Sequence, residues 1–77
     1  MQRSEWSDTE IYLAVFNASR GMESAEIAAL LQNYGFQRSE GAITAKLFRL
    51  KGDNPILVKG GGWDEQGTET WLKQLSQ

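Results

Sequence analysis

The side chains best suited to bind another molecule are the cations between residues 38 and 59. This window carries five basic and two acidic side chains, a net charge of +3, whereas residues 1–37 carry −3 and residues 60–77 carry −2. Lysine and arginine contact phosphate oxygens, and a local positive field guides an anion even when the whole chain has a net charge of −2. The charge pattern therefore predicts phosphate contact. The cations are Arg38, Lys46, Arg49, Lys51 and Lys59.

Two simpler interpretations of these cations stay open. Any short window of a small chain fluctuates in net charge, and cations near the end of a helix favour the negative end of the helix dipole without binding anything. A solvated, basic helix face is therefore the alternative to a phosphate-binding surface.

Catalysis and metal binding are not expected. The sequence contains no histidine and no cysteine, which removes the commonest general base, the commonest metal ligand and all thiolates. The acidic residues gather where helices are expected to begin, and capping and dipole effects explain that placement. We predict that the protein is not an enzyme and holds no metal or cofactor.

The run Lys59-Gly60-Gly61-Gly62 superficially suggests a phosphate-binding loop. Its order is wrong for the GxxxxGK motif, and no strand–loop–helix unit of that type surrounds it. We expect a turn here. The alternative is a mobile arm that lies along a nucleic-acid backbone or a peptide.

The cations must be positioned by a helix that begins after Ser39, whose hydroxyl is a good N-cap. Ile43, Leu47 and Leu50 recur at i, i+4 and i+7, so they form one apolar stripe. Gly52 is expected to end this helix. The helix therefore docks by the stripe and presents a basic, small-residue face to a partner.

Phe48 lies off this stripe, so it needs a separate explanation. It is either a surface anchor for a partner or an apolar side chain that a following segment covers. The run Ile56-Leu57-Val58 is available for that purpose, so we predict that Phe48 is covered.

A first helix is expected from about residue 8 to residue 20, with Gly21 as its stop. Ser7 and Glu10 form a capping box, in which each side chain accepts a backbone N–H of the other's turn. The helix is apolar nearly all round, and such helices are usually covered on two sides.

A second helix is expected after Ser24 as N-cap, from residue 25 to residue 33 or 34, with Gly35 as its stop. The turn to the central helix is short. The two helices are therefore expected to meet at a steep angle, as in a helix-turn-helix.

The C-terminal part is predicted as a turn over residues 52–55, an extended segment over 56–59, and a last helix over 65–75 with Asp64 as N-cap. This last helix is expected to cover the second apolar face of the first helix. Gly67 should weaken its first turn by roughly 1 kcal/mol relative to alanine.

The chain has 77 residues, which indicates a single domain over residues 1–77. No apolar run approaches the roughly 20 residues needed to span a bilayer, and the N-terminus has no signal-peptide h-region. We expect an intracellular protein without a membrane partner, nuclear if the source is eukaryotic. The sequence leaves open whether it is a monomer or a homodimer.

Three segments resemble the Myb/SANT-like helix-turn-helix family, which belongs to the homeodomain-like class. They are Trp6 with Glu10, the run Gly21-x-x-Ser24 with Ile27, Ala28, Leu30 and Leu31, and Arg38-Ser39-x-x-Ala42-Ile43-x-x-x-Leu47. The resemblance implies an all-α fold. It has a three-helix core over residues 5–51, and residues 52–77 add a turn, an extended segment and a fourth helix that packs on the core. Of the family's three core aromatic residues, Trp6 keeps the first position and Leu47 stands at the third.

The resemblance implies a DNA-binding module in transcription or chromatin that contacts the duplex through its third helix. The family's outward positions fall here on Gly41, Thr44, Ala45 and Phe48. Thr44 can hydrogen-bond a base, but none of the four offers the bidentate donors that discriminate bases strongly. The alternative implied by SANT-type relatives is a protein-interaction or dimerisation module, with a basic tail as a possible partner. The predicted nucleic-acid-binding residues are Arg38, Gly41, Thr44, Ala45, Lys46, Phe48, Arg49, Lys51 and Lys59.

Overall fold

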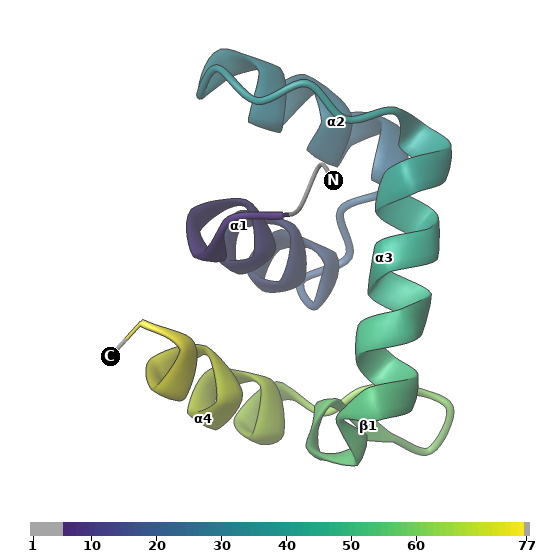
Figure 1. Cartoon of the computed structure of the whole chain (residues 1–77). Coiled ribbons are helices and arrows are strands. Elements are labelled where there is room, and N and C mark those ends of the chain that lie inside the picture. Colours follow the sequence, from purple (N-terminus) through teal and green to yellow (C-terminus); the bar gives the residue numbers. More distant parts are fainter. Residues whose placement is uncertain (1–5, 77) are drawn as a thin grey trace.

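A computed structural model describes residues 6–76 of the chain. Most of this part is helical, as predicted, and a small two-stranded hairpin is added (Figure 1). The order is α1 (Asp8–Ala18), α2 (Ser24–Asn33), α3 (Glu40–Asp53), the 3-10 turn η1 (Pro55–Leu57), β1 (Val58–Lys59), β2 (Gly62–Trp63) and α4 (Glu65–Leu75).

The start of α1 confirms the predicted capping box. Glu10 Oε1 accepts the Ser7 backbone N–H at 2.9 Å, and Ser7 Oγ accepts the Glu10 N–H at 3.2 Å. The helix ends at Ala18, two residues before the predicted end, and Gly21 turns the chain away with φ +99°. Glycine adopts this left-handed conformation without the steric cost that a side chain would bring.

The start of α2 corrects one prediction. The N-cap is Glu23, whose backbone N–H donates to the Glu26 carboxylate at 3.0 Å, and Ser24 is the first helical residue. Because Ser24 lies inside the helix, its hydroxyl reaches a different partner: the Thr44 hydroxyl on α3, at 2.7 Å. The predicted stop at Gly35 is confirmed, since the helix ends at Asn33 and Gly35 has φ +89°.

The start of α3 is confirmed and its end is corrected. Ser39 Oγ accepts the Ala42 N–H at 3.1 Å, which makes Ser39 the N-cap. Gly52 does not stop the helix, which continues to Asp53. The end comes from Pro55, because a proline disfavours helical dihedrals at the residue before it. Asn54 accordingly leaves the helix, and its side-chain amide donates to the Leu50 carbonyl at 2.9 Å.

The segment predicted as extended over residues 56–59 begins instead as the 3-10 turn η1, and only Val58 and Lys59 are extended. These two residues pair with Trp63 and Gly62 in an antiparallel hairpin. Gly60 and Gly61 connect the strands with φ +60° and +86°. Two positive φ angles in a two-residue loop define a type I′ turn, which suits glycine, so the predicted turn is confirmed.

The last helix has the predicted bounds, and Asp64 accepts the Gly67 N–H at 3.3 Å as its N-cap. Gly67 has a role that its helix propensity does not reveal. A Cβ at this position would lie 1.9 Å from the Ile56 carbonyl oxygen. The absence of a side chain therefore lets α4 touch the backbone of η1.

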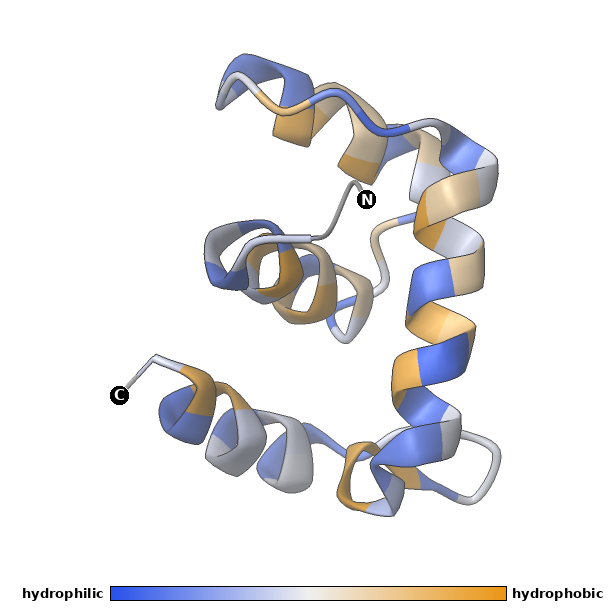
Figure 2. Cartoon of the chain, viewed as in Figure 1, coloured by the Kyte–Doolittle hydropathy of each residue, from blue (hydrophilic) through white to orange (hydrophobic). Residues whose placement is uncertain are grey.

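The positions at which the four helices begin and end determine how they pack. In Figure 1, α1 lies between α2 and α4, and α3 runs along one side of the stack; α1 makes contacts with all three other helices. The prediction that α4 covers the second apolar face of α1 is confirmed. Figure 2 shows that apolar residues turn toward the inside of this arrangement. The core consists of Ala14, Val15, Ala18, Ile27, Leu31, Ile43, Leu47, Leu57 and Leu72. Within residues 6–76, no helix is long and apolar enough to cross a membrane.

Candidate nucleic-acid interface

The orientation of α3 is fixed by its buried side chains. Ile43 is fully buried and Leu47 keeps 8% of its surface, so one face of the helix is held in the core. At about 100° per residue, the opposite face carries small or apolar residues at a helical spacing. The predicted outward positions are all exposed: Gly41, Thr44, Ala45 and Phe48.

Arg38, a predicted phosphate contact, lies in a different environment. Its Nε donates to Glu10 Oε2 at 2.5 Å and its Nη2 to Oε1 at 3.1 Å, so the guanidinium grips the carboxylate with two bonds. The guanidinium carbon also lies 4.7 Å from the centre of the Trp6 ring. Arg38 therefore ties the turn between α2 and α3 to the start of α1, and we remove it from the candidate interface.

The ion pair changes the titration of both partners. Hydrogen bonding from Arg38 lowers the pKa of the Glu10 carboxyl below its ordinary value, against the opposing effect of burial. The same bond raises the pKa of Arg38. Glu10 is thus both the capping residue of α1 and the counter-ion of a cation that is distant in sequence. Sequence reasoning found only the first role, because no local spacing relates residues 28 positions apart.

The other predicted cations lie on the C-terminal half of α3 and on the hairpin. Arg49 and Lys59 are exposed, and Lys46 is half-buried. The Lys51 ammonium lies 5.0 Å from the centre of the Trp63 ring, which holds it beside the hairpin by a cation–π contact. The structure thus brings Lys51 and Lys59 together, although β1 follows α3 only after the η1 turn.

The other half of α3 lies beside the start of α2, where the Ser24 and Thr44 hydroxyls are hydrogen-bonded at 2.7 Å. Glu40 is the acidic residue in the first turn of α3, and Lys51 is the basic residue in its last turn. The charge of the helix therefore becomes more positive from its start toward the hairpin.

The prediction that Phe48 is covered is wrong: 78% of its surface is exposed. Because residues 55–57 wind into a 3-10 turn, Leu57 points into the core and Ile56 remains 45% exposed. Neither covers the Phe48 ring. Instead the ring borders a depression of about 380 Å³ between α3 and the hairpin. The depression is lined by Phe48, Lys51, Gly52, Val58, Lys59, Gly60 and Gly61.

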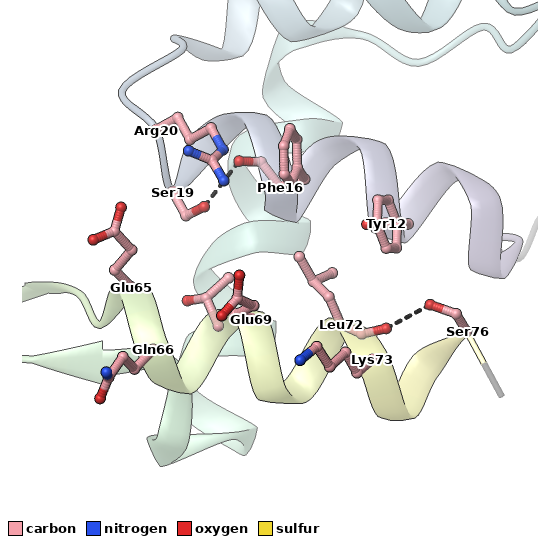
Figure 3. A pocket seen from close by; sticks show the side chains of 11 residues that line it. Tyr12, Phe16, Ser19, Arg20, Glu65, Gln66, Glu69, Leu72, Lys73 and Ser76 are labelled. Carbon is pink, nitrogen blue, oxygen red and sulfur yellow. Dashed lines mark hydrogen bonds between the residues drawn. The ribbon is translucent and has the colours of Figure 1, made fainter.

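A second concavity of about 400 Å³ lies between α1 and α4 (Figure 3). Tyr12 and Phe16 stack with their centroids 6.0 Å apart, and the Arg20 guanidinium lies 4.3 Å from the centre of the Phe16 ring. The charged residues on its α4 wall are Glu65, Glu69 and Lys73, so cations and carboxylates balance when Arg20 is included. This groove has no preference for an anion, unlike the surface beside Phe48.

Comparison with known proteins gives no match: no family model, no curated protein and no solved structure matches this chain. The functional argument therefore depends on the geometry and charge of the surface itself.

Proposed function

We propose that this domain binds nucleic acid, with duplex DNA as the leading ligand, in transcription or chromatin. The observation that carries the proposal is the exposed surface formed by the C-terminal half of α3 and the hairpin. There Lys51 and Lys59 line the depression beside the exposed Phe48 ring, and the exposed Arg49 and the half-buried Lys46 add two further cations on α3. Clustered cations are the electrostatic signature of phosphate binding.

The arrangement of α1, α2 and α3 supports the same proposal. We propose that these helices form a Myb/SANT-like helix-turn-helix core. Residues 34–39 connect α2 to α3, and the buried face of α3 leaves its other face open to a partner. The readout would involve few base-specific contacts, because Gly41, Thr44 and Ala45 offer no bidentate donors.

Binding of labelled duplex DNA, measured by fluorescence anisotropy at two salt concentrations, tests the proposal. Each phosphate contact adds roughly −0.9 to the slope of log affinity against log salt concentration. Replacing Lys46 and Arg49 together with alanine should weaken binding to all sequences and flatten the slope by roughly one unit per lost contact. The control is Lys73→Ala, which removes an exposed cation of α4 from the groove between α1 and α4.

The alternative is a protein-interaction or dimerisation module. The exposed Phe48 ring favours it, because single aromatic anchors are common in protein interfaces. Absence of duplex binding at low salt, with a folded parent, would favour this alternative over the proposal. Unchanged binding by the Lys46/Arg49 variant would show that α3 does not contact the DNA.

A further inference from the structure

Gly52 has no explanation in the fold of the chain. It lies in the last turn of α3, is exposed, and does not adopt a left-handed φ. A Cβ built at this position meets no atom within 4 Å. Alanine is a better helix former than glycine, so neither packing nor backbone conformation accounts for a glycine here. What the glycine does provide is an open floor for the depression beside Phe48.

The walls of this depression combine one flat ring with two ammonium groups. Phe48 borders it from α3, and the turn residues Gly60 and Gly61 border it from the hairpin. Both turn glycines are favoured by their positive φ, and they leave the turn itself without side chains. Lys51 and Lys59 supply the charge, and Trp63 keeps Lys51 at the rim.

The chemistry of the lining selects one kind of ligand. An exposed phenyl ring offers a face for stacking, and ammonium groups bind phosphate as point charges. Among residues 6–76, no asparagine, glutamine or arginine lines the depression, so this lining lacks the side chains that read base edges in pairs. A flat anionic ligand that alternates ring and phosphate meets these conditions, and a nucleotide in a single strand is such a ligand.

We infer that the depression binds one unstacked base of single-stranded nucleic acid. The Phe48 ring lies against the face of the base. The absence of a side chain at Gly52 lets the base approach α3 closely, and Lys51 and Lys59 contact the flanking phosphates. This inference rests on the proposed function and adds a second form of nucleic acid, an unpaired strand, that the same surface binds. Stacking on an aromatic side chain is tolerant of sequence, because every base has a π-face.

The test compares two labelled ten-nucleotide strands of equal charge by fluorescence anisotropy: oligothymidylate, and an abasic phosphodeoxyribose strand. The parent should bind oligothymidylate roughly 5- to 100-fold more tightly, the range expected for one stacked base. Phe48→Ala should abolish the difference, and Phe48→Trp should restore it. Lys59→Ala should weaken binding to both strands equally.

Gly52→Ala separates binding from stability. This variant should keep or raise the melting temperature and yet lose the preference for oligothymidylate, because the new methyl group occupies the floor. Gln74→Ala is the control: it places an alanine at an exposed helical position, on α4 and outside the depression. It should bind as the parent does.

Two results would overturn the inference. They are equal affinity of the parent for both strands and a preference that survives Phe48→Ala. If either of these occurs while the Lys46/Arg49 variant still loses duplex binding, the proposed function stands and only the inference fails. If the parent binds neither duplex nor single strand at low salt, both fail.

Discussion

The Arg38–Glu10 pair gives the sharpest test of how this fold is held together, because it separates a structural cation from a ligand-binding one. We predict that Arg38→Ala destabilises the domain, whereas Arg49→Ala does not. Arg38 donates two hydrogen bonds to Glu10, but Arg49 is exposed. Surface substitutions usually change stability by no more than about 0.5 kcal/mol.

The magnitude follows from the burial of the pair. The side chains of Arg38 and Glu10 keep 15% and 6% of their surface, so removing the guanidinium leaves a largely buried carboxylate. Removing one partner of a buried pair costs about 3–5 kcal/mol. Glu10 keeps its bonds to Ser7 and the Arg38 side chain keeps 15% of its surface, so we expect a cost at or below the lower end of that range, about 2–3 kcal/mol. A domain of this size has roughly 4–12 kcal/mol of stability, so the variant should still fold.

The assay is urea unfolding, monitored by tryptophan fluorescence and repeated at several pH values. With a slope of about 1 kcal/mol per molar urea, the midpoint of Arg38→Ala should fall by about 2–3 M at pH 7. The pKa of Glu10 is lowered in the folded state, so its contribution is present above its ordinary pKa of 4.5 and is lost as the pH falls through the folded value. The difference between parent and variant should therefore shrink as the solution is acidified below that ordinary value.

Two results would refute this reasoning. One is an Arg38→Ala midpoint equal to that of Arg49→Ala. The other is a difference between parent and Arg38→Ala that stays constant from pH 7 to pH 3, which would mean that the contact of the guanidinium with the Trp6 ring, and not its ion pair with Glu10, supplies the stability. Arg38→Lys should lie between parent and alanine, since an ammonium keeps the charge but not the two-bond fork.

Two further predictions concern the core. Leu47→Ala should lower the free energy of unfolding, measured with urea, by roughly 2–5 kcal/mol, because it leaves a cavity where the Leu47 side chain is buried. Leu47→Met should be about as stable as the parent, because it nearly conserves the side-chain volume. Gly67→Ala should destabilise by about 1–3 kcal/mol despite its better helix propensity, because its Cβ would lie 1.9 Å from the Ile56 carbonyl oxygen. An unchanged or higher midpoint for Gly67→Ala would contradict the close contact between α4 and η1.

The parts of the fold that the sequence predicted well depend on signals within four residues. Ser39 and Asp64 each accept a backbone N–H three residues ahead, and Ser7 does the same within its capping box. Such short-range chemistry is visible in the sequence because both partners are separated by a fixed spacing. The buried positions of α3 follow equally directly from helical periodicity.

The errors arise where a distant or following residue decides the outcome. Gly52 was expected to end α3, but Pro55 and the Asn54 cap set the end. Ser24 was expected to cap α2, but its hydroxyl bonds to Thr44 on another helix. Phe48 was expected to be covered, but the 3-10 turn buries Leu57 and leaves the ring exposed. None of these partners could be identified from spacing alone.

The charge of the candidate interface also depends on a residue that is distant in sequence. Residues 38–59 carry a net charge of +3. Glu10, outside this window, binds Arg38, so that cation stabilises the fold and contributes little field to the surface. The remaining cations extend from Lys46 to Lys59, toward the hairpin and away from Glu40 in the first turn of α3. Because long-range pairing removes a charge at one end of α3 and leaves the other end positive, the ligand-binding surface we propose lies toward the hairpin and not at the start of the helix.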